Sequence, residues 1–197
     1  MAPASEITLS SLSYMKPEQL FTELEQQFET SPGSKPRVAV IDVRDSDHLG
    51  GHIRGSEWVP SDQLDARIPE LIRLHGDKEK VVFHCMLSQQ RGPRAALKFA
   101  RALEREKAKT LANSKGKSVS NDGETRMQSE GEQLVQPTIS EGKGATKDGE
   151  VSDKTADEEH LPKVCVLEGG FGMWQARYGE DERLTEAYVK DLWEDAY

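Results

Sequence analysis

One short segment of this 197-residue sequence combines a nucleophile and a cation at a spacing that suits oxyanion chemistry. The segment reads Val81-Val-Phe-His-Cys-Met-Leu-Ser-Gln-Gln-Arg-Gly-Pro93, with Cys85 and Arg91 at the two ends of a loop. The apolar run before Cys85 predicts a buried strand, and Gly92-Pro93 predicts the start of a helix. A loop that enters a helix directs backbone N–H groups and the positive end of the helix dipole to one point. That environment favours the thiolate, which is the nucleophilic form of cysteine.

This loop is therefore the candidate catalytic site. Its backbone amides form a nest for a tetrahedral oxyanion, and an arginine adds a planar fork that holds two of the oxygens. We predict Cys85 as the nucleophile and Arg91 as the catalytic cation, with His84 and Gly92 as supporting residues. The predicted oxyanion- or phosphate-binding residues are Met86, Leu87, Ser88, Gln89, Gln90 and Arg91. A cysteine alone would be interpreted as a small buried hydrophobe, so the spacing and the context carry the prediction.

The elements that must position this loop alternate along the chain. Strands are predicted over residues 38–43, 58–59, 81–84 and 164–167. Helices are predicted over residues 17–28, 62–74 and 92–107, with short helices from Phe171 and from Leu184. Ser61 or Asp62 is the expected cap of the second helix. Strands that alternate with helices predict an α/β fold with a mostly parallel central sheet flanked by helices. In such a sheet, ligands bind beyond the carboxyl ends of the strands.

The first predicted helix illustrates how the core is expected to form. Leu20, Leu24 and Phe28 recur at helical spacing, so they share one face that we expect to pack on the sheet. The strand at residues 38–43 is a continuous apolar run up to Asp42, which is typical of a strand buried on both faces.

The polarity of the chain is concentrated in one stretch. Only 35% of residues are hydrophobic and 31% are charged, and the mean hydropathy is −0.71. Residues 109–160 consist mainly of Gly, Ser, Thr, Lys, Glu and Asp with scattered aliphatics. Such a segment cannot bury enough apolar surface to offset the entropy lost on ordering, so it is predicted to be a disordered insertion. We therefore expect one catalytic domain made of residues 1–108 and 161–197, interrupted by the insertion 109–160.

Composition and charge exclude several classes of function. A net charge of −9 argues against a general nucleic-acid binder. Two cysteines, Cys85 and Cys165, cannot form a disulfide framework and suggest a reducing compartment. The N-terminal residues do not form a secretory signal, and no apolar run approaches the roughly 18 residues that span a bilayer. Cys165 has no partner at zinc-ligand spacing. We expect a cytoplasmic or nuclear protein without a metal site and without membrane or nucleic-acid partners.

The motifs also resemble a known family. His84-Cys85-x-x-Ser88-x-x-Arg91-Gly92-Pro93 resembles the active-site signature of the rhodanese-fold phosphatases. That group includes the M-phase inducer dual-specificity phosphatases and the small fungal and plant phosphatases and arsenate reductases. The residues Ile41-Asp-Val-Arg44 with Gly51-His-Ile-Arg-Gly-Ser56 resemble the N-terminal motif of rhodanese domains. The segment Val166-Leu-Glu-Gly-Gly-Phe171-x-x-Trp174 resembles their closing strand-helix motif. The resemblance implies a single rhodanese-like domain and a tyrosine or dual-specificity phosphatase that works through a cysteinyl-phosphate.

The resemblance leaves alternatives open. Rhodanese-type sulfurtransferases typically have a six-residue active loop, whereas Cys85 to Arg91 spans seven residues, which favours the phosphatase and arsenate-reductase branch. An arsenate reductase would use the same cysteine with glutathione or glutaredoxin as reductant, or Cys165 as an internal thiol, although its apolar run favours a structural role. A non-catalytic interaction module is the remaining alternative. The expected partner is a phosphorylated protein or a small oxyanion, and phosphate hydrolysis requires no cofactor.

A general acid is missing from the motif. M-phase inducer phosphatases carry glutamates in this loop, where this sequence has Met86 and Gln90. The Trp58-Val-Pro-Ser-Asp62 segment is not a substitute, because it lies where a core strand and a helix cap are expected. Three aspartates that follow the strand at residues 38–43 could contribute, or could serve as caps and ion-pair partners: Asp42, Asp45 and Asp47. Without an acid, substrates with good leaving groups such as phenolates are favoured.

Overall fold

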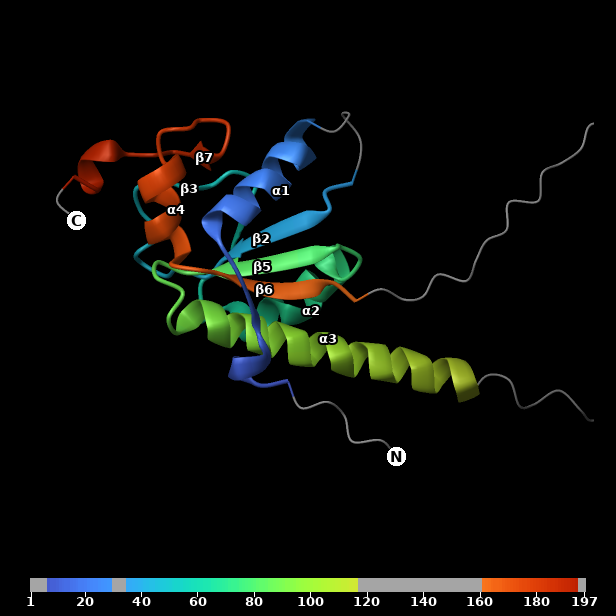
Figure 1. The fold of residues 1–197 in the computed structure, drawn as a ribbon. Helices are drawn as coiled ribbons and strands as arrows, with labels where there is room; N and C mark the ends of the chain where they lie inside the picture. Colours follow the sequence, from blue (N-terminus) through green and yellow to red (C-terminus); the bar gives the residue numbers. More distant parts are fainter. Residues whose placement is uncertain (1–6, 30–34, 117–160, 195–197) are drawn as a thin grey trace, which may run out of the picture.

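The computed structural model describes residues 7–29, 35–116 and 161–194. Its centre is a five-stranded sheet with the strand order β1-β6-β5-β2-β4, in which all neighbouring strands are parallel (Figure 1). The strands of this sheet are β1 (Ser13–Met15), β2 (Val38–Asp42), β4 (Glu57–Trp58), β5 (Lys80–His84) and β6 (Lys163–Leu167). Two further strands, β3 (His52–Ile53) and β7 (Thr185–Glu186), form a small antiparallel pair. The predicted α/β fold with a mostly parallel sheet is confirmed.

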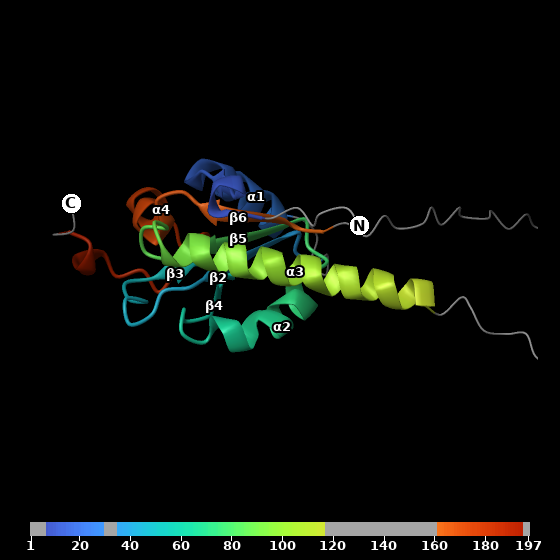
Figure 2. The same ribbon diagram turned by 90° about the horizontal axis from the view of Figure 1, so that it is seen from below.

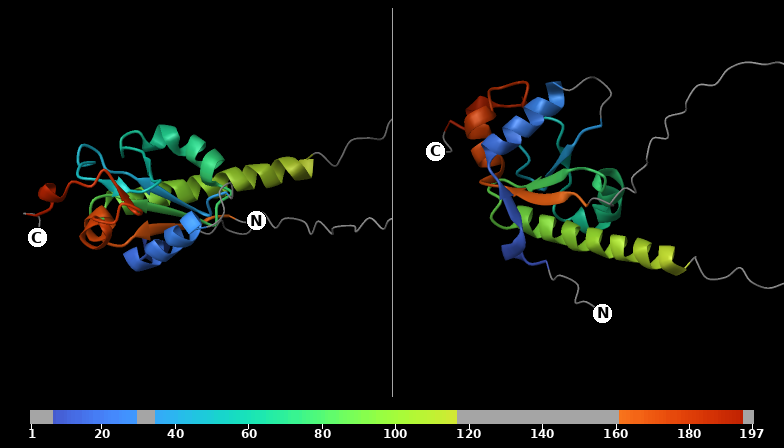
Figure 3. Two further views of the ribbon diagram at one scale, coloured as in Figure 1. Left: turned by 90° about the horizontal axis from the view of Figure 1, so that it is seen from above. Right: turned by 45° about the vertical axis from the view of Figure 1, so that its right-hand side comes forward.

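Helices cover both faces of this sheet. Those on one face are α1 (Pro17–Glu29) and α4 (Gly170–Tyr178), and those on the other are α2 (Leu64–His75) and α3 (Arg91–Gly116). Figures 2 and 3 show α1 and α2 on opposite sides of the strands. Two short 3-10 helices, η1 (Leu9–Ser11) and η2 (Lys190–Leu192), complete the described elements.

The two cores explain why the strands read as continuous apolar runs. Successive side chains of a strand point to opposite faces. Ile41 accordingly packs with Phe83 and Phe99 on the side of α2 and α3, whereas Val40 packs with Trp174 on the side of α1 and α4. Because both faces of the sheet are covered, both sets of side chains are apolar.

One predicted helix is a strand, and another helix begins later than predicted. The helix expected from Leu184 is instead strand β7, because the Leu184 carbonyl accepts a hydrogen bond from Arg54 and the next two residues pair with β3. Helix α2 begins at Leu64 after Gln63, rather than after Ser61 or Asp62. Ser61 does not cap the helix because its amide and hydroxyl both donate to the Asp45 carboxylate.

Helix α3 is longer than the sequence pattern predicts. It continues to Gly116 and extends beyond the end of the sheet (Figure 1). Residues 109–116, which the sequence places in a disordered insertion, are therefore helical; among them Lys109, Leu111 and Ala112 are good helix formers. The rest of the predicted insertion, residues 117–160, lies outside the described residues. In helix α1, Leu20 and Leu24 are buried as expected, but Phe28 is 44% exposed near the end of the helix.

Candidate active site

The parallel register brings two functional segments to the same edge of the sheet. Asp42 at the end of β2 lies opposite His84 at the end of β5, so the chain leaves both strands side by side. The loop from Cys85 to Gln90 joins β5 to helix α3, and Arg91 is the first residue of that helix. The segment that follows β2 therefore faces the predicted catalytic loop.

Cys85 lies at the base of this loop. The residue is only 4% exposed, and the backbone amide of Ser88 donates to its Sγ at 3.2 Å. Ser88 adopts a left-handed conformation with φ of 52°, which is uncommon for a residue other than glycine. Its buried hydroxyl has no hydrogen-bond partner among the described residues. The loop thus curls around the sulfur and directs an N–H group towards it.

The other loop residues contribute backbone rather than side chains. Met86 packs partly against the core on the side of α1 and α4, Leu87 is 52% exposed, and Gln89 and Gln90 are exposed. In the described part of the chain, the backbone amides of residues 89–92 donate no hydrogen bond. Their binding of an oxyanion at the start of helix α3 stays a prediction from the sequence, and no hydrogen bond fixes the exposed side chains of Gln89 and Gln90 within the described residues.

Helix α4 holds the loop through two backbone hydrogen bonds, a role that the sequence pattern does not predict. Phe171 donates its amide to the Cys85 carbonyl, and Gly172 donates to the Met86 carbonyl, both at 2.9 Å. Gly170 has a φ of +59°, and a Cβ at this position would lie 2.3 Å from the Cys85 oxygen. The consecutive glycines at 169 and 170 are the sequence feature that could indicate this close approach of backbone to backbone. Taken alone, however, they predict only a break between a strand and a helix.

Arg91 is bound by two of the aspartates that follow β2. Its Nη1 donates to Asp45 at 3.0 Å and to Asp47 at 2.7 Å, and its Nη2 donates to Asp47 at 2.5 Å. The hydrogen bonds from Arg91 lower the pKa of Asp47 to about 2 and raise the pKa of Arg91. Burial would raise the pKa of Asp45, but hydrogen bonds from Arg91 and Ser61 more than offset it and lower the pKa. Both aspartates are thus carboxylates, not proton donors, near neutral pH.

The third aspartate, Asp42, lies in a buried network beneath the loop. Arg44 donates to the Asp42 carboxylate from Nε at 2.8 Å and from Nη2 at 2.6 Å, and both side chains are fully buried. Burial would raise the pKa of Asp42, but the charges of His84 and Arg44 and the Arg44 hydrogen bonds lower it. Asp42 is therefore a structural anion, not a general acid in contact with substrate.

His84 belongs to this network and supports the loop from within. The residue is fully buried, and its Nδ1 lies 3.4 Å from the Cys85 carbonyl oxygen and 3.8 Å from Asp42. Burial lowers the pKa of His84 despite the nearby carboxylate, so Arg44 is the cation that balances Asp42 near neutral pH. The Arg44 guanidinium also lies 4.0 Å from the centre of the Phe171 ring, which connects the network to helix α4.

Cys165 lies away from the candidate nucleophile. It is buried in the core on the side of α1 and α4, whereas Cys85 belongs to the core on the side of α2 and α3. Burial raises the pKa of the Cys165 thiol. Because the sheet separates the two sulfurs, Cys165 cannot act as an internal thiol partner of Cys85 in this fold.

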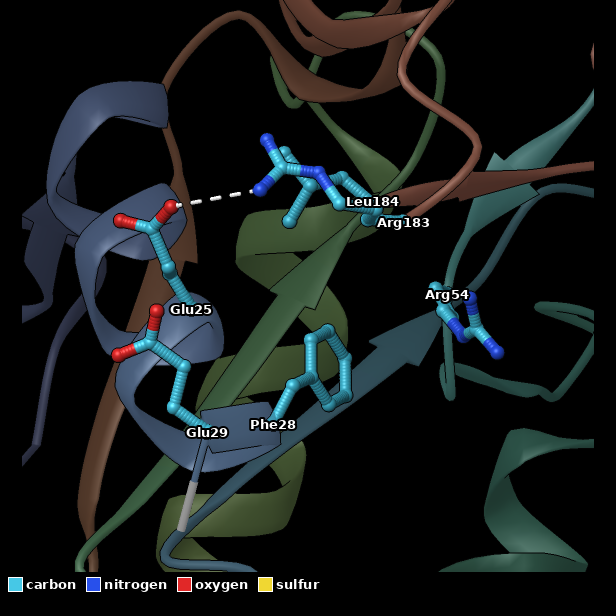
Figure 4. A pocket seen from close by; sticks show the side chains of 6 residues that line it. All are labelled: Glu25, Phe28, Glu29, Arg54, Arg183 and Leu184. Atoms are coloured by element: carbon cyan, nitrogen blue, oxygen red, sulfur yellow. Dashed lines mark ion pairs between the residues drawn. The ribbon is translucent and has the colours of Figure 1, made fainter.

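A surface pocket of about 420 Å³ does not coincide with the loop. It is lined by Glu25, Phe28, Glu29, Arg54, Arg183 and Leu184 (Figure 4). Both of its arginines are paired with carboxylates: Arg183 lies 3.8 Å from Glu25 in the pocket, and Arg54 lies 3.4 Å from Glu186 outside it. The pocket contains no nucleophile, so the loop at Cys85 remains the candidate active site.

The described residues contain no cluster of three or more histidine, cysteine, aspartate or glutamate side chains placed to hold a metal ion. Nor does any helix in these ranges have the length and apolar character needed to cross a bilayer.

Comparison with known proteins identifies the fold family. The model of the Rhodanese-like domain family matches residues 22–121, which is about half of the chain. This range includes β2, β5 and α3, the elements that flank the candidate catalytic loop. The chain belongs to the rhodanese family. This rhodanese domain is 30% identical over 178 residues to the dual specificity phosphatase ibp1 of Schizosaccharomyces pombe, with 90% of this chain and 99% of that protein covered.

Other relatives of this rhodanese domain are phosphatases and arsenate reductases. It is 28% identical to the CDC25-like phosphatase YCH1 of Saccharomyces cerevisiae, with 94% of this chain and 97% of that protein covered. A local match to arsenate reductase 2.1 of Oryza sativa is 51% identical over 75 residues, but covers only 38% of this chain and 47% of that protein. A solved yeast protein tyrosine phosphatase of the rhodanese family superposes with a TM-score of 0.55 at 26% identity, covering 95% of this chain and 99% of that chain.

Proposed function

We propose that this rhodanese domain is a cysteine-dependent protein phosphatase of the tyrosine or dual-specificity class. The observation that supports the proposal is the loop between β5 and α3: the Ser88 amide donates to the Cys85 sulfur, the amides of residues 89–92 donate no hydrogen bond within the described residues, and Arg91 begins the helix that follows. Two relatives that match over nearly their full length are phosphatases, which supports the proposal of phosphatase activity. The proposed substrates are phosphorylated proteins.

The proposed reaction has two displacement steps. In the first, the Cys85 thiolate attacks phosphorus, the S–P bond forms, and the P–O bond to the leaving group breaks. In the second, water attacks the cysteinyl-phosphate, the S–P bond breaks, and inorganic phosphate leaves while the thiolate is restored. Arg91 and the loop amides stabilise the charge on the non-bridging oxygens in both steps. No cofactor is needed, since the chain itself supplies the nucleophile and the positive field.

None of the three aspartates that follow β2 is placed to protonate the leaving group. Asp45 and Asp47 are ionised by their contact with Arg91, and Asp42 is buried with Arg44. A phenolate can depart without a proton, whereas the alkoxide of serine or threonine cannot readily do so. We therefore propose phosphotyrosine as the preferred substrate.

A matched pair of cysteine variants tests this proposal. Hydrolysis of p-nitrophenyl phosphate, a phosphotyrosine peptide and a phosphoserine peptide is measured for the wild type, Cys85→Ser and Cys165→Ser. We expect the wild type to prefer the two aryl esters, Cys85→Ser to lose at least about 1,000-fold in rate, and Cys165→Ser to keep the wild-type rate. Activity that survives in Cys85→Ser would overturn the mechanism, and equal rates on both peptides would overturn the substrate preference.

Arsenate reduction is the second candidate, favoured by the local match to the rice arsenate reductase. The Cys85 thiolate would displace hydroxide from arsenate to form an As–S bond. A glutathione thiol would then attack Sγ, so that the S–As bond breaks, its electron pair reduces arsenic, and arsenite leaves. A second thiol, from glutathione or glutaredoxin, would release Cys85 from the mixed disulfide. The external thiol is required because Cys165 lies on the other side of the sheet.

The same variants separate the two candidates. Glutathione-coupled arsenate reduction that depends on Cys85, in a protein that does not hydrolyse the aryl phosphates, would favour the reductase. Thiocyanate formation from thiosulfate and cyanide would instead indicate a sulfurtransferase. If none of the three reactions occurs, the domain is an interaction module.

A further inference from the structure

The contacts of Arg91 divide its five N–H groups into two sets. Three N–H groups, two on Nη1 and one on Nη2, donate to Asp45 and Asp47. The Nε–H and the second N–H of Nη2 have no acceptor within the described part of the chain. These two N–H groups lie along one edge of the planar guanidinium, and such a pair can bind two oxygens of one oxyanion.

The two aspartates are themselves held in place without help from Arg91. The Ser61 amide donates to Asp45 Oδ1 at 2.7 Å, and the Ser61 hydroxyl donates to Oδ2 at 2.9 Å. The Asp45 amide in turn donates to Asp47 Oδ1 at 2.9 Å. The segments after β2 and β4 therefore fix the carboxylates, and the carboxylates fix the guanidinium before any ligand arrives.

We infer that Asp45 and Asp47 are positioning residues, which hold Arg91 with its Nε/Nη2 edge free to bind the oxyanion. The kinetic part of this inference rests on the proposed function. Asp47 contributes more than Asp45, since it accepts two of the three hydrogen bonds.

The charge of the aspartates shows what kind of effect to expect. Two carboxylates beside an anion site do not attract the substrate, because they repel it. Their contribution lies in holding the donors where charge develops in the transition state, so that no reorganisation is needed during the reaction. Loss of a carboxylate should therefore lower kcat rather than raise KM.

Kinetics of asparagine variants test this inference on the whole chain. For p-nitrophenyl phosphate, we expect kcat to fall about 10-fold to 100-fold in Asp47→Asn and less in Asp45→Asn, with KM unchanged or lower. Asp65→Asn is the matched control: this exposed carboxylate binds Lys98 at 2.8 Å on helix α3, away from the loop, and its removal should leave kcat unchanged. Melting temperatures establish that each variant is folded.

A double-mutant cycle shows whether the aspartates act through Arg91. In an Arg91→Lys background, Asp47→Asn should change kcat by less than about twofold, because the fork that it orients is already absent. The inference would be overturned if folded Asp45→Asn and Asp47→Asn both kept the wild-type kcat. It would also be overturned if Asp47→Asn lowered kcat as much in the Arg91→Lys background as in the wild type.

A spectroscopic measurement separates this inference from the proposed function. The Arg91 ¹⁵Nε–¹H signal, assigned by its absence in Arg91→Lys, should shift when tungstate is added to Cys85→Ser and should broaden in Cys85→Ser/Asp47→Asn. If the wild type hydrolyses no phosphate ester but this signal behaves as expected, only the proposed function fails. If hydrolysis occurs and the signal is the same with and without Asp47→Asn, only the positioning role fails.

Discussion

At the scale of single residues, the loop depends on what surrounds it as much as on Cys85 and Arg91. Gly170 allows helix α4 to approach so closely that its amides bind the carbonyls of Cys85 and Met86. The curvature of the loop, with Ser88 in a left-handed conformation, is therefore imposed from outside the loop. Cys85 and Ser88 lie in contact where helix α3 and helix α4 both begin, so the N-termini of two helices meet at this segment.

Two glycines allow the role of Gly170 to be measured. Gly170 and Gly55 both have positive φ, but a Cβ on Gly55 would meet no atom within 4 Å. An alanine at either position costs about 1–2 kcal/mol from its backbone conformation. At Gly170 the clash with the loop adds about 1–3 kcal/mol and displaces Cys85.

We expect Gly170→Ala to unfold at lower denaturant concentration than Gly55→Ala and to lose about tenfold or more in kcat/KM, while Gly55→Ala keeps the wild-type value. Urea unfolding and aryl phosphate kinetics check both effects. Equal kcat/KM in the two variants would show that contact with helix α4 does not shape the loop.

At the scale of elements, helix α3 presents the cation and fixes it to the core. Its first residue is Arg91, and one turn later its apolar face packs on the sheet through Ala95, Ala96 and Phe99. Phe99 is fully buried, and its ring centre lies 5.3 Å from that of Phe83 on β5, the strand that leads to Cys85. The packing of α3 on β5 therefore sets the distance between the two ends of the loop.

Two phenylalanines provide a matched test of this packing. Phe99→Ala should lower the free energy of unfolding by about 3–5 kcal/mol, because it leaves a cavity between α3 and the sheet. Phe28→Ala, at a residue that is 44% exposed, should cost about 1 kcal/mol or less. Urea denaturation compares the two variants. A cost for Phe28→Ala as large as that for Phe99→Ala would restore the sequence-based placement of Phe28 in the core.

At the scale of the whole molecule, the domain is assembled from segments on both sides of residues 117–160. Strand β6 follows that stretch, yet it lies between β1 and β5 in the sheet, and helix α4 follows β6. The candidate catalytic loop, which precedes the stretch, is supported by helix α4, which comes after it. The site therefore forms only when both parts of the chain are folded together.

Shortening of the predicted insertion tests whether it is separate from the core. Deletion of residues 125–152 leaves every described element intact. Because each halving of a flexible loop changes its closure free energy by only about 0.6 kcal/mol, we expect a stability equal to or slightly above that of the wild type and unchanged aryl phosphate kinetics. Urea unfolding and kinetics measure both, and a large loss of either would show that this segment contributes to the fold or the site.

The sequence alone was sufficient for the features that depend on neighbours in the chain. Apolar runs and their spacing predicted strands β2, β4, β5 and β6 and helices α1 to α4, but not the short strands β1, β3 and β7. The types and spacing of Cys85 and Arg91 predicted the loop between β5 and α3, because these patterns are local. The helix expected from Leu184 failed because pairing with the distant strand β3 overrides local preference.

Only the tertiary structure could decide what surrounds the loop. Asp45 and Arg91 are 46 residues apart in the sequence, and helix α4 is separated from Cys85 by helix α3, residues 117–160 and β6. No local sequence pattern therefore links the aspartates to Arg91 or helix α4 to the loop. The parallel register of β2 and β5 brings the aspartates to the arginine, and the same sheet separates Cys85 from Cys165. The sequence determined which groups could react. The packing of distant segments determined how Arg91 is oriented and that Cys165 is kept away from Cys85.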